Sequence, residues 1–343
     1  MTSQPSLMGS RGRAGVLLFL AVCVIAANMR TTITGLGPLL EQISADIGTP
    51  LSVLGVLASV PLIAWALISP VANDLSRRFG LTRVMMWALI LLLVGTIVRS
   101  LPGLVANLWV GTAVIGAALA LMNVLMPAVI RRDFPLRVPQ MTGLYSALLG
   151  GVGALMAGMV VPISNIEIGG TRAGWRIALL SMGALLPLAI VLWGAWQRSY
   201  DRPRDRRVVP ERIKTRIWSD PVAWQVALYM GSQSAAFYIL VTWIAPMSTS
   251  FGHSETVGGF NVMIYQMVGL LGSLGVPFLL EGSLRRWTPM LLPSLGLVGA
   301  VGLIFAPDFI VVWAIMCGLA AGSSLTMALT LMAERAQDFK VAV

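Results

Sequence analysis

Acidic side chains are scarce in this chain, and the groups that bind metals or carry out catalysis are scarcer still. Its 343 residues include 14 Asp and Glu, one His and two Cys, and charged residues make up 11% of the total. A soluble domain has roughly 25% charged residues, so an ordinary soluble protein is excluded. His253 alone cannot form a metal site, and Cys23 and Cys317 lie in apolar segments, where a thiol behaves as a small hydrophobe. We expect no metal, no cofactor and no disulfide.

No Asp or Glu falls inside a long apolar segment, since Glu41 and Glu281 stand at the edges of such segments. An intramembrane enzyme would need paired acids, a Ser/His set or a metal cluster, so we expect no enzymatic activity. A carboxylate relay for protons, common in membrane pumps and transporters, is also not visible in this sequence.

Apolar residues account for 57% of the chain and occur in runs of about twenty, the length that crosses a bilayer. Lipid cannot satisfy backbone N–H and C=O groups, so each span is expected to be helical. Prolines inside spans, such as Pro61, Pro127, Pro187 and Pro277, predict local kinks. We predict an all-α membrane protein with ten transmembrane helices, at residues 14–40, 51–73, 84–101, 105–130, 141–163, 175–197, 221–245, 257–280, 288–305 and 309–332.

Basic residues are divided unequally between the loops on the two sides of the membrane. With a cytoplasmic N-terminus, twenty of the 24 Lys and Arg fall in cytoplasmic segments and one, Arg30, falls within the membrane. Only Arg99, Arg172 and Arg176 then fall in segments on the external side of the membrane. Positively charged loops stay on the cytoplasmic side, so this asymmetry predicts that both termini are cytoplasmic.

The longest polar stretch, residues 198–220, lies between the sixth and seventh spans and holds eight basic residues. It lacks interleaved aromatic residues, so we interpret it as a solvated cytoplasmic linker near anionic lipid and not as a nucleic-acid site. It separates a six-helix half, residues 1–197, from a four-helix half, residues 221–343. A weak repeat supports this division, because residues 76–80 (SRRFG) follow the second span as residues 283–287 (SLRRW) follow the eighth.

One cation, Arg30, lies well inside the first span. Residues 16–27 before it carry no charge, and Leu39 and Leu40 after it are apolar. A guanidinium at the centre of a transmembrane helix costs about 2.5–3.5 kcal/mol on the insertion scale. Such a residue usually pairs with another group or faces a watery cavity, which favours a role in binding a small anion. The alternative is that Arg30 lies nearer the outer end of the helix and extends its charge to the headgroups.

The fifth span contains a glycine-rich run that includes Gly150, Gly151 and Gly153, followed by Gly158. A nucleotide-binding loop would follow a strand, and no strand precedes this run. We therefore predict that these glycines allow close packing between helices.

Several motifs spread over nearly the whole chain belong to one recognisable pattern. They are Asn28-Met29-Arg30 with Gly37-Pro38-Leu39-Leu40 in the first span, residues 123–135 (NVLMPAVIRRDFP), residues 141–145 (MTGLY), residues 174–176 (GWR) and Trp224-Gln225. With these motifs the sequence resembles the cyanate permease family of the major facilitator superfamily. The resemblance implies a helix bundle of that superfamily in the plasma (inner) membrane that moves a small solute by alternating access. Cyanate and nitroimidazole-like compounds are among the substrates associated with that family.

The same resemblance implies a central cavity lined by the first, fourth, fifth, seventh, eighth and tenth helices. Arginine supplies a planar cationic donor, Asn and Gln supply neutral hydrogen bonds, and aromatic side chains supply flat walls. Each of these is also compatible with a packing role between helices. The substrate-binding residues that we predict are Arg30, Asn28, Asn123, Tyr145, Gln233, Tyr238, Trp243 and Gln266, with Asn261 and Tyr265 on the same helices.

The sequence departs from the family pattern in three ways. Thr31 stands where the family usually has proline. In the loop between helices two and three, Arg77 replaces an aspartate and Asn73 replaces the first glycine, which weakens any carried-over gating role, although Asp74 lies nearby. The family has twelve helices and we count ten, so we interpret the chain as truncated after the tenth helix.

These observations together predict a secondary transporter of a small anionic or polar solute, cyanate-like or nitroimidazole-like. Its partners would be the lipid bilayer and the solute, with no nucleic acid, and the sequence makes no prediction of oligomeric state. Two alternatives remain open: a truncated membrane protein without transport activity, and a drug or metabolite exporter of the same superfamily.

Overall fold

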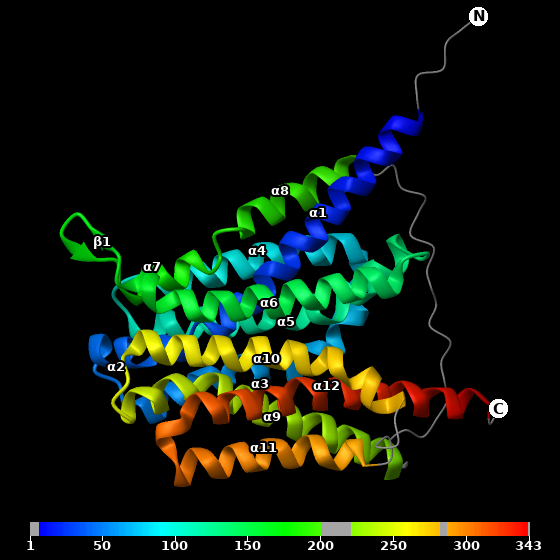
Figure 1. The fold of residues 1–343 in the computed structure, drawn as a ribbon. Coiled ribbons are helices and arrows are strands. Elements are labelled where there is room, and N and C mark those ends of the chain that lie inside the picture. Colours follow the sequence, from blue (N-terminus) through cyan, green and yellow to red (C-terminus); the bar gives the residue numbers. More distant parts are fainter. Residues whose placement is uncertain (1–6, 200–220, 282–286, 342–343) are drawn as a thin grey trace, which may run out of the picture. The chain divides into compact units, whose positions relative to one another are not determined.

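The computed structural model describes residues 7–199, 221–281 and 287–341. These residues are almost entirely helical (Figure 1), apart from one two-stranded hairpin. The chain divides into two compact units, Met1–Met156 with Val160–Val208 and Ala157–Met159 with Val209–Val343. Of the predicted linker, residues 200–220 lie outside the described residues.

The first unit forms helices at all six predicted N-terminal spans. Within it α5 packs against α3 and α4, and α8 packs against α1 and α4. Its elements are α1 (Leu7–Thr34), η1 (Gly37–Leu39), α2 (Leu40–Ile47), α3 (Leu51–Phe79), α4 (Leu81–Ser100), α5 (Val105–Asp133), α6 (Val138–Ser164), β1 (Glu167–Ile168), β2 (Thr171–Arg172), α7 (Gly174–Ser181) and α8 (Leu186–Ser199).

The first predicted span, residues 14–40, is not one continuous helix. α1 ends at Thr34, and the chain passes through η1 into the short helix α2. Pro38 has no N–H to donate to the Thr34 carbonyl, so the α-helical ladder cannot continue past this point. Gly35 and Gly37 lower the helix propensity of the same stretch further.

The sixth predicted span, residues 175–197, is interrupted as well. α7 ends at Ser181 and α8 begins at Leu186. Pro187 cannot donate to the carbonyl of Gly183, which makes the predicted kink a complete break. Pro61 and Pro127, in contrast, lie inside α3 and α5 without ending them.

Buried apolar residues of the first unit form two separate clusters. The larger cluster joins α1, α4, α5 and α8, and its buried residues on α1 end at Met29. The smaller cluster joins η1, α2 and α7 to parts of α3, α5 and α6; it begins with Leu36 and includes Met182. Leu186, just past the second break, belongs to the larger cluster again. The boundary between the two clusters therefore coincides with the two helix breaks.

A short hairpin between α6 and α7 was not predicted. Glu167 pairs with Arg172 and Ile168 with Thr171 in an antiparallel register. Gly169 and Gly170 form the turn with φ values of 62° and 85°. Two-residue hairpin turns of this hand require positive φ at both central positions, which glycine adopts without steric cost.

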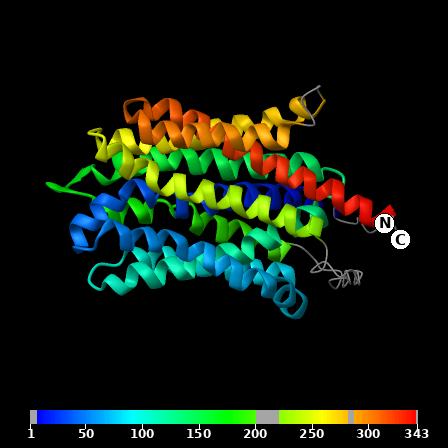
Figure 2. The ribbon, with the colours of Figure 1, turned by 90° about the horizontal axis from the view of Figure 1, so that it is seen from below.

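In its described residues, the second unit consists of α9–α12 with one short 3-10 helix. α12 packs against α10, α11 and α9 (Figure 2). α10 and α12 approach closely at Gly269 and Gly322, and the Ser273 hydroxyl donates to the Gly322 carbonyl at 2.8 Å. The elements are α9 (Pro221–Ser250), α10 (Glu255–Glu281), α11 (Thr288–Phe305), η3 (Pro307–Phe309) and α12 (Ile310–Val341).

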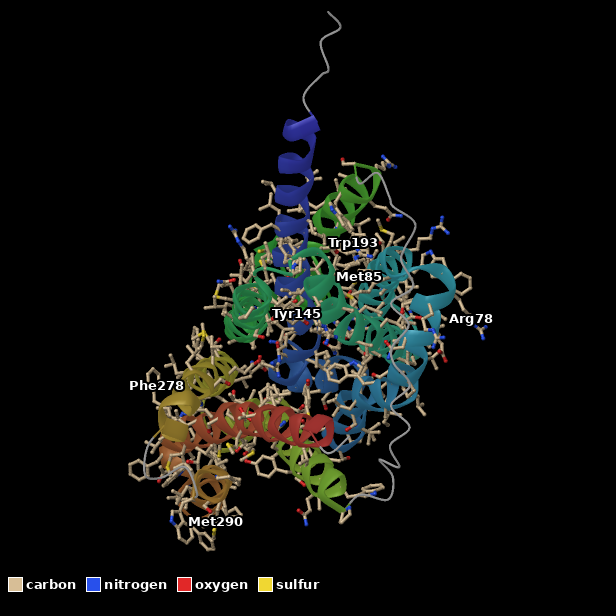
Figure 3. All side chains as sticks on the ribbon, turned by 90° about the vertical axis from the view of Figure 1, so that its right-hand side faces the viewer. Arg78, Met85, Tyr145, Trp193, Phe278 and Met290 are labelled. Carbon is tan, nitrogen blue, oxygen red and sulfur yellow. The ribbon has the colours of Figure 1, made fainter. Side chains whose placement is uncertain are left out.

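Large apolar side chains cover the outside of both units. Phe278 is 77% exposed and Met290 is 67% exposed. Figure 3 shows both pointing away from their helices, whereas Met85 and Trp193 lie inside the first unit. Such a surface is unfavourable in water and compatible with lipid tails.

By length and composition, nine helical segments in the described part of the chain can cross a membrane. They correspond to nine of the ten predicted spans. The seventh predicted span forms α9, whose 30 residues are long enough to cross, but polar residues such as Gln225 and Gln233 lower its apolar character. Both cysteines are free, with Cys317 buried and Cys23 half-buried.

Candidate functional site

Arg30 lies on α1, one turn before that helix ends. It is half-buried, and its side-chain stem lies against α6 at Gly153, where a Cβ would come within 3.0 Å of the Arg30 Cβ. The stem occupies space that only a glycine leaves open, which confirms the predicted packing role of Gly153.

Tyr145 lies on α6 and approaches the same turn of α1. It is half-buried, and its hydroxyl donates to the Met29 sulfur at 3.5 Å. Met29 directly precedes Arg30, so the phenol lies against the turn of α1 that carries the cation. Figure 3 shows the Tyr145 side chain within the first unit. α1 and α6 therefore bring together two of the predicted contacts, a cation and an aromatic hydroxyl.

The other two predicted residues of the first unit have different surroundings. Asn28 is 1% exposed, and its Nδ2 donates to the Val24 carbonyl at 2.7 Å within α1. One of the two amide hydrogens of Asn28 is therefore used in a hydrogen bond within its own helix. Asn123 is half-buried on α5.

Threonine hydroxyls fix the last turn of α1 to its neighbours. The Thr31 hydroxyl lies 3.0 Å from the carbonyl oxygens of Asn28 and Met182, between which its single proton is shared. The Thr34 hydroxyl lies 3.1 Å from the carbonyl oxygens of Arg30 and Gly153. Thr31, at which the sequence departs from the family's usual proline, therefore connects the two interrupted helices through a group that proline lacks.

The second unit holds the remaining predicted residues, and three of them lie on α9. Gln233, Tyr238 and Trp243 are half-buried. The Gln233 Nε2 donates to the Ser234 hydroxyl at 2.8 Å. The ring of Tyr238 meets the Phe237 ring edge-on, with centroids 5.1 Å apart.

α10 contributes a second set of polar groups to this unit. Gln266 is 7% exposed, and its Nε2 has no hydrogen-bond partner among the residues that the structure describes. Asn261 is 1% exposed and donates to the Ser248 hydroxyl of α9 at 2.9 Å. Tyr265 is fully buried, with its ring 5.6 Å from that of Phe237. Asn261 and Tyr265 therefore join α10 to α9, whereas Gln266 keeps an amide donor for a further partner.

A sequence model of the Major Facilitator Superfamily matches residues 18–342. The chain belongs to the major facilitator superfamily. Its all-α architecture and its spans of membrane-crossing length fit that assignment, so this superfamily member is an integral membrane protein. The fold class and the resemblance predicted from the sequence are confirmed.

Relatives within the superfamily are named as transporters. The chain is 36% identical to the 2-nitroimidazole transporter of Escherichia coli (strain K12) over 340 residues. The aligned region covers 98% of this chain and 84% of that relative. It is 28% identical over 318 residues to the cyanate transport protein CynX of the same organism, covering 92% and 80% of the two chains. A bacterial homolog of the human lysosomal transporter Spinster, inward-facing and unoccupied, has the same fold with a TM-score of 0.77. That match has 16% identity and covers 96% of this chain and 76% of the other.

One buried residue of this superfamily member escaped the sequence analysis. Arg99 was counted as an external residue, but it is 1% exposed. Its Nη1 donates to the Thr32 carbonyl of α1 at 2.6 Å. The sequence did contain one signal of this burial, because Arg99 falls inside the predicted span 84–101. Arg99 was nevertheless assigned to an external loop, because it lies near the end of that span.

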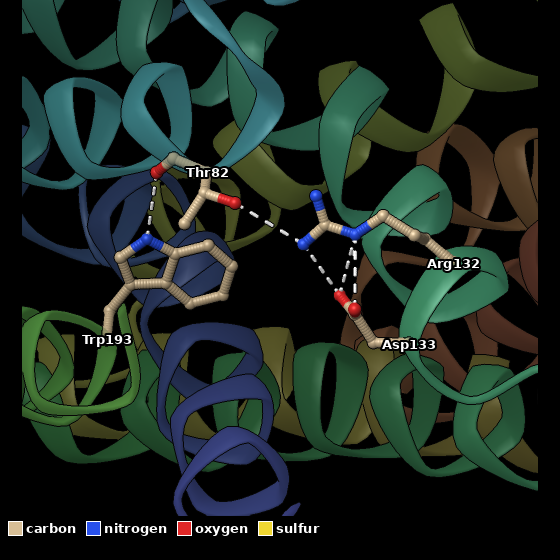
Figure 4. Close-up of polar contacts among 4 residues, drawn as sticks. All are labelled: Thr82, Arg132, Asp133 and Trp193. Carbon is tan, nitrogen blue, oxygen red and sulfur yellow. Dashed lines mark hydrogen bonds and ion pairs between the residues drawn. The ribbon is translucent and has the colours of Figure 1, made fainter. Parts of the chain in front are cut away.

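A polar network joins the ends of α4, α5 and α8 in the same unit (Figure 4). Arg132 pairs with Asp133 at 2.8 Å and also donates to the Thr82 hydroxyl at 3.3 Å. The Nε1 of Trp193 donates to the Thr82 carbonyl at 3.0 Å. Trp193 packs on Trp196, whose ring lies 5.9 Å from the Arg132 guanidinium. The motif at residues 123–135 was recognisable in the sequence, but the partners of its last residues were not.

Another network joins the short helices α2 and α7. Both Nη1 of Arg176, at 2.6 Å, and Nε1 of Trp175, at 3.0 Å, donate to the Asp46 carboxylate. The Arg176 guanidinium also lies 4.2 Å from the Trp175 ring centroid. This cluster fixes α2 to α7 beyond the two helix breaks.

Proposed function

We propose that this chain is a secondary transporter that moves a small polar or anionic solute across the membrane by alternating access. The observation that carries the proposal is the position of Arg30, a cation within an apolar span and next in the chain to Met29, which contacts the Tyr145 hydroxyl. Two relatives, named for transport of 2-nitroimidazole and of cyanate, indicate the kind of solute. Transport by alternating access also fits the fold shared with an inward-facing transporter.

Cyanate and nitroimidazoles offer the acceptors that a guanidinium binds well. Cyanate is an anion with acceptor atoms at both ends, and a nitro group presents two oxygens in one plane. Arg30 supplies a positive charge and several N–H donors in a fixed plane. Tyr145 supplies a flat aromatic face and a hydroxyl for the same solute. The proposed contacts of the second unit are Gln233, Tyr238, Trp243 and Gln266, and Asn28 and Asn123 complete the set of the first unit.

The proposal includes the orientation and division of the chain. Both termini lie in the cytoplasm, the membrane is the inner membrane, and residues 198–220 link a half at residues 1–197 to a half at residues 221–343. The distribution of Lys and Arg supports the orientation.

Uptake measurements with Arg30 variants test the proposal. Labelled 2-nitroimidazole and labelled cyanate serve as probes, and the amount of inserted protein is measured in parallel. Losing a hydrogen bond to a charged group costs about 1.5–3 kcal/mol, so Arg30→Gln should lower uptake about tenfold or more. Arg30→Lys should also impair uptake, because a point charge does not replace a planar donor fork.

Matched substitutions at an exposed arginine provide the control. Arg83→Gln and Arg83→Lys change an exposed residue of α4 and should leave uptake unchanged. If Arg30→Lys is fully tolerated, Arg30 reaches the headgroups as a lysine would, and its role as a solute contact is wrong. Absence of saturable uptake of either probe by the unsubstituted chain would contradict transport of this class of solute.

A further inference from the structure

Two interrupted helices meet inside the first unit. α1 ends at Thr34, and the Thr31 hydroxyl lies 3.0 Å from the carbonyl oxygen of Met182, in the break between α7 and α8. A Cβ at Gly35 would come within 3.2 Å of the Met182 side chain. A helix end leaves backbone carbonyls without their usual donors, and a buried carbonyl requires another partner.

Arg99 supplies such a partner at the end of α1. In a continuous helix the Thr32 carbonyl would accept from the N–H of Leu36, but that N–H donates to the Ile33 carbonyl at 3.1 Å. The Nη1 of Arg99 donates to the Thr32 carbonyl at 2.6 Å. The helix dipole also favours a cation at a C-terminal end. Arg99 therefore replaces the hydrogen bond that the break removes.

Only part of the Arg99 guanidinium is used in this contact. Its Nε and Nη2 have no hydrogen-bond partner among the described residues, and the same holds for the Thr32 hydroxyl. A buried guanidinium that is so incompletely paired is costly, and an apolar side chain would pack at this position at lower cost. The contact that an apolar residue cannot make is the donation to the Thr32 carbonyl.

α5 and α6 hold the two sides of this arrangement in place. A Cβ at Gly111 of α5 would come within 2.6 Å of the Arg99 Cα, so α4 and α5 are in backbone contact there. On α6, the Gly153 carbonyl lies 3.1 Å from the Thr34 hydroxyl. The last turn of α1, which carries Arg30, is thereby fixed between α4 and α6.

We propose that Arg99 is a positioning residue for Arg30. By holding the Thr32 carbonyl, it sets the direction in which the last turn of α1 presents the Arg30 side chain to the solute. The inference rests on the proposed function, because it takes Arg30 to be a solute contact. Arg99 itself touches no solute and acts through the backbone of α1.

Kinetics of 2-nitroimidazole uptake by the full chain in proteoliposomes test this role. Arg99→Met keeps an unbranched stem and removes the donor, so it should raise KM about tenfold with a Vmax within about twofold of the parent. Arg99→Lys retains a donor and a charge, and should restore most of the affinity. Arg83→Met makes the same change at an exposed position of the same helix and should leave KM unchanged.

A double substitution shows whether Arg99 acts through Arg30. In the Arg30→Gln background, Arg99→Met should change KM by less than about twofold, because the side chain that it positions is already gone. Effects that multiply would mean that the two arginines act independently, and would overturn the inference. Equal impairment by Arg99→Lys and Arg99→Met would overturn it as well.

Hydrogen exchange separates this inference from the proposed function, because it requires no solute. Arg99→Met should speed amide exchange in residues 33–39, and so should Gly111→Ala, which displaces Arg99 while retaining its guanidinium. Gly15→Ala has open space around its added methyl group and should have no effect there. Unchanged exchange in both variants would overturn the inference. Faster exchange in a protein that binds neither 2-nitroimidazole nor cyanate would refute the proposed function and leave Arg99 as the residue that fixes α1.

Discussion

A single glycine decides how closely Arg30 can approach α6. At Gly153 an added Cβ would meet the Cβ, Cγ and Cδ of Arg30 at 3.0, 3.2 and 3.5 Å. The hydrogen bond between the Thr34 hydroxyl and the Gly153 carbonyl holds the two helices at this separation. The direction of the Arg30 side chain therefore depends on a residue that has no side chain of its own.

We predict that Gly153→Ala lowers solute affinity without removing any polar group. Inserting a methyl group into a packed contact costs about 1–3 kcal/mol, which the Arg30 stem can relieve only by moving. Uptake of 2-nitroimidazole, normalised to inserted protein, measures the effect. Gly143→Ala on the same helix, where the added methyl group meets nothing within 4 Å, is the control. Equal uptake by the two variants would contradict the contact between Arg30 and Gly153.

Arg30 could be singled out from the sequence and the burial of Arg99 could not, for a physical reason. Arg30 stands in the middle of an uncharged run, so its place in the membrane follows from hydropathy alone. Arg99 stands near the end of its span, where hydropathy does not separate a buried helix end from a loop. The contact between Tyr145 and Met29 requires α1 and α6 to meet in space, and no pattern within either segment carries that information.

At the scale of helices, α4, α5 and α8 are joined through one backbone carbonyl and one hydroxyl of Thr82. Trp193 donates to the carbonyl and Arg132 to the hydroxyl (Figure 4). Trp193 is fully buried, so its indole contributes both this hydrogen bond and a large packing surface.

We predict that Trp193→Phe lowers the stability of the protein by about 1–3 kcal/mol, through the lost hydrogen bond and the lost volume. Thermal unfolding in detergent measures the change. Trp87→Phe on α4, at a position that is 46% exposed, should have a much smaller effect. A similar decrease in unfolding temperature for the two variants would show that Trp193 does not join these helices.

Helix positions were predictable because lipid forces each apolar run to satisfy its own backbone hydrogen bonds. The breaks were only partly predictable. Pro187 was named as a kink, but the stop at Thr34 was missed, because the run of apolar residues continues through Pro38 to Leu40. Hydropathy measures whether a segment enters the membrane and carries little information on whether its helix is continuous.

At the scale of the whole molecule, the orientation in the membrane remains a prediction of charge alone. Reporter proteins fused near residue 5 and near residue 340 should both report a cytoplasmic location. A reporter inserted at Gly169, in the turn of the hairpin, should report the opposite side, because one predicted membrane span separates it from each flanking cytoplasmic loop. An external signal from either terminus would contradict the ten predicted spans.

The two clusters of the first unit also have a consequence for local unfolding. α2 and α7 have eight residues each, and helices shorter than about 12 residues are marginal on their own. Their order therefore depends on the smaller cluster and on the Asp46 carboxylate, which binds Trp175 and Arg176 together. α2 and α7 should open as one foldon, with matching exchange rates that rise together in Asp46→Asn while the amides of α8 stay protected.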